Sequence, residues 1–177
     1  MNIPTLSGKT FGIEVEFLAN NSQGTIVESL NDLVGHRGIR VYSAYYSDDD
    51  SSKWRIKPDS SLSGTRTHRN GMELVSPILK TEDDAKDFYY ILEALNTLDV
   101  TVNRSCGLHV HIGMAGVQTN QIHTIMESYS ACESQIDSMI PVSRRNDNAY
   151  YACLFYTSYP ADEQHLVNLD RRPQKHN

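Results

Sequence analysis

The sequence has no long hydrophobic run and no leader-like start. No stretch of its 177 residues approaches the ~18 continuous apolar residues of a membrane-spanning helix. The N-terminal Met-Asn-Ile-Pro also lacks the basic and then apolar pattern of a signal peptide. We therefore expect neither a membrane partner nor secretion.

Basic residues and cysteines are also few. The chain has 16 lysines and arginines against 22 acidic residues, a formal net charge of -6, whereas nucleic-acid binding through phosphates requires a basic face. Cys106, Cys132 and Cys153 are odd in number and widely spaced, which fits neither a CxxC metal site nor a disulfide framework. We expect no nucleic-acid partner and a reducing, cytoplasmic location.

The length predicts one domain over residues 1–177, because about 100–200 residues usually build one core. Alternating apolar and polar residues are typical of half-buried strands. The predicted strands span residues 10–17, 54–57, 72–76 and 108–112, with an edge-like strand within 38–46. Asn70-Gly71 is a turn signal between extended segments.

Helix signals are clearest after residue 80. Thr81 and Asp84 form a variant of the capping box, and apolar residues follow at 3–4 spacing. Further helices are predicted from about residue 119, more weakly over 25–34, and over 161–168. Strands and helices mix without regular βαβ alternation, so we expect an α+β fold with helices packed on one face of a mainly antiparallel sheet.

Two of the predicted strands carry paired ligand-type side chains. Glu14 and Glu16 are two residues apart, as are His109 and His111, and such residues project from one side of a strand about 7 Å apart. Carboxylates and imidazoles together suit a divalent cation, with oxygens for Mg²⁺ or Mn²⁺ and nitrogen for softer ions. Glu73, in another short strand, is a third candidate carboxylate.

Either pair alone is more typical of the solvent side of a half-exposed strand than of a site. Gly12 and Gly107 precede the two pairs, however, and strand glycines often mark close backbone approach. The combination favours a metal site slightly over a plain polar face.

Five motifs also occur in the order found in one known family. They are residues 11–17 (FGIEVEF), 54–62 (WRIKPDSSL), 71–77 (GMELVSP), 106–111 (CGLHVH) and 141–145 (PVSRR). From about residue 10 to residue 168 the chain resembles the putative amidoligase family, which has the fold of glutamine synthetase and glutamate–cysteine ligase.

The resemblance implies a glutamine-synthetase-like catalytic domain with a curved antiparallel sheet. It implies an ATP-dependent ligase with Mg²⁺ or Mn²⁺ that phosphorylates a carboxylate and lets an amine displace the phosphate. Metal ions bridging phosphate oxygens would lower the dense negative charge of such a reaction. The partners it implies are small-molecule or peptide acids and amines.

Residue roles follow from the same resemblance. Glu14, Glu16 and Glu73 would hold metal, and His109 resembles the histidine ligand of the glutamine synthetase HxH motif. His111 is a less certain ligand and would instead orient phosphate or substrate.

Asp59, Arg144 and Arg145 complete the candidate site. Asp59 resembles the aspartate that helps to deprotonate the incoming amine, although an aspartate after Pro58 equally suits a turn cap. An Arg-Arg pair alone is more typical of a solvated surface. The resemblance makes Arg144, with Arg145 beside it, the expected phosphate partner, which the guanidinium fork suits.

One departure from the family pattern is clear. A strand with a Glu-Phe-Arg motif is expected after residues 167–169, but the sequence continues as DRRPQKHN and contains no such motif. We therefore expect a domain without this last strand, either because the natural chain is short or because the sequence is a fragment of a longer one. The main alternative is a degenerate member that binds metal, nucleotide or a protein partner without ligase turnover.

Two more candidate functions and one candidate interface rest on weaker signals. A metal-dependent hydrolase would use the carboxylate and histidine residues to activate water, and Cys106 beside His109 would be a nucleophile. Tyr45, Tyr46 and Tyr150 are expected at the surface, where they suit an aromatic pocket or an interface in a homo-oligomer.

Overall fold

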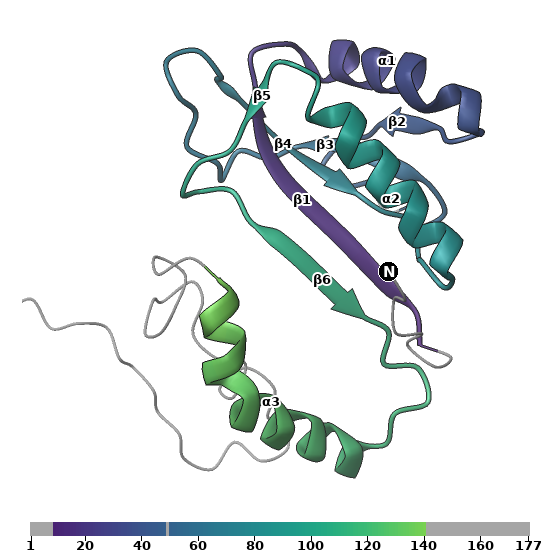
Figure 1. The fold of residues 1–177 in the computed structure, drawn as a ribbon, viewed down its shortest axis with the longest axis vertical. Coiled ribbons are helices and arrows are strands. Elements are labelled where there is room, and N and C mark those ends of the chain that lie inside the picture. The colour runs from purple at the N-terminus through teal and green to yellow at the C-terminus, as the bar shows by residue number, and fades with distance from the viewer. Residues whose placement is uncertain (1–8, 49, 141–177) are drawn as a thin grey trace, which may run out of the picture. The chain divides into compact units, whose positions relative to one another are not determined.

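A computed structural model describes residues 9–48 and 50–140. The chain divides into two compact units, residues 1–115 and 116–177. The described part of the first unit contains β1 (Phe11–Ala19), α1 (Gln23–Val34), a 3-10 turn (Gly35–Arg37), β2 (Val41–Ser43), β3 (Trp54–Pro58), β4 (Asn70–Val75), α2 (Glu82–Leu95), β5 (Val100–Thr101) and β6 (Leu108–Ile112) (Figure 1).

The strands form one sheet with the order β2-β3-β4-β1-β5, and β6 also pairs with β1. β1 is the longest strand: β4 flanks one side of it, while β6 and β5 follow one another along the other side. All pairings are antiparallel except β2 with β3, which is parallel. The predicted α+β fold with a mainly antiparallel sheet is confirmed.

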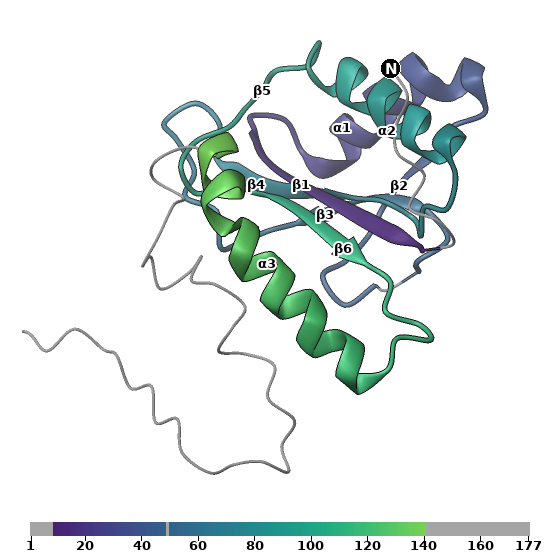
Figure 2. The same cartoon turned by 60° about the horizontal axis from the view of Figure 1, so that its bottom comes forward.

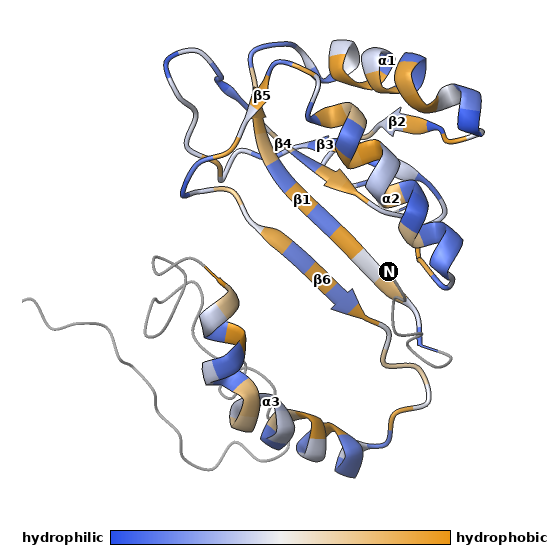
Figure 3. Ribbon diagram, in the orientation of Figure 1, coloured by the Kyte–Doolittle hydropathy of each residue, from blue (hydrophilic) through white to orange (hydrophobic). Residues whose placement is uncertain are grey.

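Alternation along β1 separates the core from the candidate site. Ile13 and Phe17 are buried in the core, whereas Glu14 and Glu16 project from the other face because successive strand residues point to opposite sides. Figure 3 shows the corresponding alternation of apolar and polar residues along this strand. We call the face that carries Glu14 and Glu16 the site face.

Helices α1 and α2 pack together on the other face of the sheet (Figures 1 and 2). The 3–4 spacing of their apolar residues puts Ile26 and Leu30 of α1, and Ile91 and Leu95 of α2, into the core. Burial of each such side chain contributes about 1.5–3 kcal/mol. The helices therefore anchor the sheet, and both described helices of this unit lie on the face opposite the site face.

The predicted capping box at α2 is confirmed. The Asp84 backbone N–H donates to the Thr81 hydroxyl at 3.2 Å, and the Thr81 N–H donates to the Asp84 carboxylate at 2.8 Å. Lys80 N–H donates to the same carboxylate oxygen at 2.6 Å. These bonds satisfy backbone donors that the first turn of a helix leaves without partners.

Two details differ from the sequence predictions. Asn70-Gly71 is not a turn: both residues lie in β4 and pair with Ala19 and Leu18 of β1. At Gly71 a Cβ would collide with the carbonyl oxygen of Asp59, so the glycine serves close strand contact. β5, only two residues long, was not predicted.

In the second unit the structure describes helix α3 (Thr119–Met139), which begins where the sequence predicts. No helix among the described residues combines the length and apolarity needed to cross a membrane. The helix predicted over residues 161–168 and the pair Arg144 and Arg145 lie outside the described residues.

Candidate functional site

The strand register brings the predicted ligand residues together on the site face. Glu16 of β1 is directly opposite Glu73 of β4, and Glu14 is directly opposite His109 of β6. His111 is opposite Gly12, one step further along the same face. Residues that are 95 positions apart, such as Glu14 and His109, therefore meet because β1 is shared by β4 and β6.

Glu14 is the centre of a carboxylate–imidazole network. Its Oε2 atom lies 3.3 Å from His109 Nδ1 and 3.2 Å from His111 Nε2. Partial burial acts to raise the pKa of Glu14, but the hydrogen bonds with His111 and His109 outweigh it and the pKa is lowered. Glu14 is therefore ionised at neutral pH.

Glu16 is held more tightly, by the backbone of Gly107. The Gly107 N–H donates to Glu16 Oε2 at 2.5 Å, while the Glu16 N–H donates to the Gly107 carbonyl at 3.0 Å. A Cβ at Gly107 would lie 2.9 Å from His109 Nε2 and 3.2 Å from Glu16 Oε2. The predicted close approach at Gly107 is confirmed, whereas a Cβ at Gly12 would meet only ordinary contacts at 3.8 Å.

Glu73 lies among like charges. Its pKa is raised, first by burial and then by the carboxylates of Glu14 and Asp59, with a smaller contribution from Glu16 and an opposing one from Lys57. We call Glu14, Glu16, Glu73 and Asp59 the carboxylate cluster. Its negative charge favours a bound cation.

Asp59 also has the contacts of a turn cap. Its Oδ1 atom accepts hydrogen bonds from the Ser61 N–H at 2.8 Å and from the Ser61 hydroxyl at 2.7 Å. The Asp59 N–H donates to the Gly71 carbonyl at 2.9 Å and so extends the β3–β4 ladder. Asp59 therefore caps the turn. It also lies near Glu73 of the site face, so its expected role in deprotonating the amine is a separate prediction to be tested.

Two cations on β3 were not singled out from the sequence. Lys57 is directly opposite Glu73, and Arg55 is two residues before it on the same face. Arg55 Nη1 donates to the Asp48 carbonyl at 2.6 Å and Lys57 Nζ to the Tyr46 carbonyl at 3.5 Å, so the chain preceding β3 covers both. The alternation of Trp54-Arg55-Ile56-Lys57 was the signal that could have placed them beside the glutamates.

The donor types and pairwise spacings of the network suit a divalent cation. Two ligands about 2.0–2.1 Å from one ion lie about 2.9–3.4 Å apart at octahedral or tetrahedral angles, which matches the distances from Glu14 to His109 and His111. Among residues 9–48 and 50–140, however, no three or more His, Cys, Asp or Glu side chains are already arranged to hold a metal. The present arrangement is a hydrogen-bonded network that an ion would have to reorganise.

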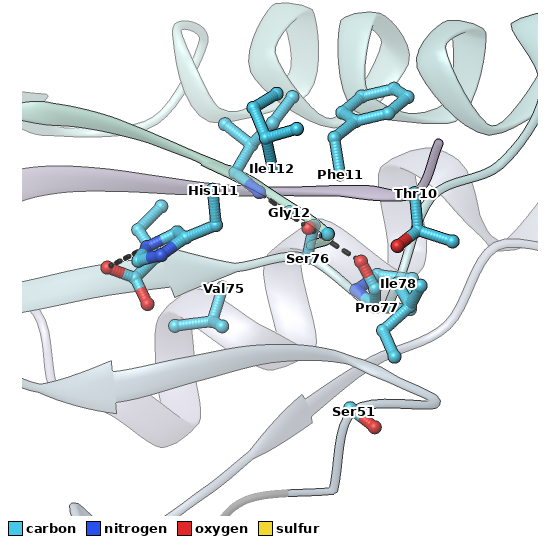
Figure 4. A pocket seen from close by; sticks show the side chains of 13 residues that line it. Thr10, Phe11, Gly12, Ser51, Val75, Ser76, Pro77, Ile78, His111 and Ile112 are labelled. Carbon is cyan, nitrogen blue, oxygen red and sulfur yellow. Dashed lines mark hydrogen bonds and ion pairs between the residues drawn. The ribbon is translucent and has the colours of Figure 1, made fainter. Parts of the chain in front are cut away.

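A pocket of about 300 Å³ lies beside Glu14 and His111 (Figure 4). It is formed by the start of β1, the end of β6 and the segment that follows β4. Its lining comprises Thr10, Phe11, Gly12, Ile13, Glu14, Ser51, Val75, Ser76, Pro77, Ile78, His111, Ile112 and Gly113. All of these belong to the first unit.

A family model described as "Putative amidoligase enzyme" matches residues 7–166. The chain therefore belongs to this family, as the order of its motifs predicted. No curated protein matches the chain well enough to be counted as a relative.

Proposed function

We propose that this protein is an ATP-dependent carboxylate–amine ligase that uses Mg²⁺ or Mn²⁺. Membership of the amidoligase family supports ligase chemistry in general. The observation that carries the specific proposal is the carboxylate cluster with two imidazoles beside Glu14. Such a set of oxygen and nitrogen donors suits the divalent ions that accompany nucleotide phosphates.

The proposed reaction has two steps. A carboxylate oxygen of the acid substrate attacks the γ-phosphorus of ATP, a bond forms between them, and ADP leaves. The amine nitrogen then attacks the carbonyl carbon of the acyl phosphate, inorganic phosphate leaves, and the nitrogen loses a proton, for which the Asp59 carboxylate is the proposed acceptor. Amide formation is thus coupled to ATP cleavage.

The residues of the chain would share this work. Glu14, Glu16, Glu73 and His109 would hold the metal, which when bound lowers the negative charge on the phosphate oxygens. His111 would orient phosphate or substrate. Arg144 and Arg145, which lie outside the described residues, would bind ATP phosphates by their guanidinium groups.

Metal binding is the first test of the proposal. Mn²⁺ or Mg²⁺ should raise the melting temperature of the protein more than Na⁺ at equal ionic strength, because an ion that binds only the folded state stabilises it by mass action. Glu73→Gln should remove this increment. Glu28→Gln, the same change on the exposed surface of α1, is the matched control and should keep it.

Turnover is the second test. With ATP and Mg²⁺, a panel of carboxylic acids and hydroxylamine as a general nucleophile, we expect ADP and hydroxamate in equal amounts, both dependent on the acid. Metal or ATP binding without product from any acid would overturn the ligase proposal in favour of a non-catalytic member of the family. Metal-dependent hydrolysis of a substrate in the absence of ATP would indicate a hydrolase instead.

A further inference from the structure

Arg55 is a buried cation whose hydrogen-bonding capacity is only partly used. The residue is 5% exposed, and its Nη1 atom donates to the Asp48 carbonyl at 2.6 Å. Its Nε atom is buried and has no acceptor among the described residues, and no carboxylate in this part of the chain forms an ion pair with it. An arginine is always charged in a protein, and a buried charge without a counter-charge is costly. The free edge of this guanidinium therefore needs an acceptor, and a negatively charged one suits it best.

Arg55 lies in the same row of the sheet as Glu14. It is directly opposite Val75 of β4, and Val75 is directly opposite Glu14 of β1. Neighbouring strands are about 4.8 Å apart, so the backbones of Arg55 and Glu14 are roughly 10 Å apart on the site face. The guanidinium is thus placed on the face where the phosphate and carboxylate oxygens of the proposed reaction would bind.

The polar cover over Arg55 is a backbone turn. The Asp48 N–H donates to the Tyr45 carbonyl at 3.0 Å and closes the turn, while the side chains of Tyr45 and Tyr46 are largely exposed. The acceptor that the turn offers to Arg55 is a neutral carbonyl. Hydrogen bonds between two ionised groups are stronger than those to a neutral carbonyl, so an oxyanion would be a better partner than this turn.

We infer that Arg55 binds an oxyanion of the ligase reaction through Nε and Nη2, the two N–H donors that lie parallel on one edge of a guanidinium. Two parallel donors match two oxygens of a carboxylate or of a phosphoryl group. The inference rests on the proposed function and adds to it a described residue that would hold either the phosphate or the carboxylate of the acid substrate. A lysine at this position keeps the charge but has no pair of parallel donors.

NMR titration of the Arg55 Nε–H signal tests this inference without any turnover. Inorganic phosphate, acetate and chloride are added separately to the protein at equal ionic strength. We expect a saturable shift with phosphate, acetate or both, and none with chloride. A response to phosphate alone would assign the site to the phosphoryl group, and a response to acetate alone would assign it to the carboxylate of the acid substrate.

Arg55→Lys should weaken binding of the responding anion, followed at the Val75 amide, on the order of ten- to a hundredfold, as loss of a hydrogen bond to a charged group does. Arg37→Lys is the matched control, because the Arg37 guanidinium stacks on the Tyr90 ring of α2 at 3.8 Å. It should bind the anion as the wild type does.

An Nε–H signal of Arg55 that responds to neither phosphate nor acetate would overturn the inference. So would an Arg55→Lys variant that melts at a lower temperature but binds the anion as tightly as the wild type, since Arg55 would then only support the turn that covers it. Hydroxamate formation is a separate measurement: full turnover in Arg55→Lys would remove this role of Arg55 and leave the ligase proposal intact. Anion binding at Arg55 in a protein that makes no product would overturn the ligase proposal and keep the oxyanion site.

Discussion

Glu16 and Gly107 are bound to each other twice, once through backbone and once through the Glu16 side chain. The Glu16 N–H donates to the Gly107 carbonyl, and the Gly107 N–H returns a bond to Glu16 Oε2. A hydrogen bond to a carboxylate is stronger than one between neutral groups. The backbone just before β6 therefore fixes the orientation of a candidate metal ligand on β1.

Gly107→Ala should weaken Mn²⁺ binding on the order of ten- to a hundredfold, the range seen when groups that orient a ligand are lost. The added Cβ would lie 2.9 Å from His109 Nε2 and would displace both His109 and Glu16. Calorimetric titration of Mn²⁺ measures the loss. The imidazole NMR signals of His109 in metal-free protein should shift as well.

Gly12→Ala is the control for this change, because a Cβ at Gly12 has ordinary van der Waals contact at 3.8 Å. We expect it to bind Mn²⁺ as the wild type does. Equal Mn²⁺ affinity in the two alanine variants would show that the close approach at Gly107 does not position the ligands.

Glu73→Gln should stabilise the metal-free protein near neutral pH. The pKa of Glu73 is raised in the folded state, so the folded protein keeps this proton to higher pH than the unfolded chain does. Its ionisation therefore costs folding free energy above the folded pKa, and the cost disappears below its ordinary value of 4.5.

Thermal melting across this pH range measures the effect. The variant should melt higher than the wild type near neutral pH and level with it in acid, while Glu28→Gln should show no such trend. A variant that is less stable at neutral pH would mean that the attraction between Glu73 and Lys57 outweighs the crowding of carboxylates.

Much of the site face could be predicted because a strand repeats every two residues. Glu14, Glu16, His109 and His111 needed only their i, i+2 spacing to be placed on common faces. The register that puts Glu14 opposite His109 is a long-range pairing, however, and nothing local in either strand specifies it. The order of the family motifs, and not the strand periodicity, indicated that these residues lie together.

Local sequence signals gave wrong predictions where contacts between distant parts of the chain determine the structure. Asn70-Gly71 has the composition of a turn, but Gly71 is needed because the Asp59 carbonyl passes close to it in the paired strand. The burial of Lys57 could not be predicted either, because it depends on the segment before β3, whose Tyr46 and Asp48 carbonyls accept hydrogen bonds from Lys57 and Arg55. A charged residue in a strand is otherwise expected at the surface.

The cap of α2 predicts a pH-dependent contribution to stability. Burial acts to raise the pKa of Asp84, but hydrogen bonds from the Lys80 and Thr81 backbone outweigh it, so the pKa is lowered. A lowered carboxyl pKa stabilises the fold above the unfolded value of 3.8, and this contribution is lost as pH falls through the folded pKa.

Thr81→Ala should lower the free energy of unfolding by about 0.5–2 kcal/mol, as the loss of a helix N-cap residue does. Asp84→Asn should destabilise the protein at neutral pH and make little difference in strong acid, where the wild-type carboxyl is protonated. Denaturant unfolding at both pH values measures the two effects. A pH-independent loss in Asp84→Asn would indicate that shape, and not charge, matters at this cap.

Asp59 can be tested by separating its turn contacts from its charge. Asp59→Asn keeps an Oδ1 acceptor for the Ser61 N–H and hydroxyl but removes the carboxylate. We expect it to melt close to the wild type and to lose most ligase turnover through kcat, if the carboxylate accepts the proton of the amine. Asp59→Ala should lose turnover and also melting temperature, because the two bonds from Ser61 would have no acceptor. An asparagine variant with full turnover, beside an alanine variant that is only destabilised, would leave Asp59 as a turn cap alone.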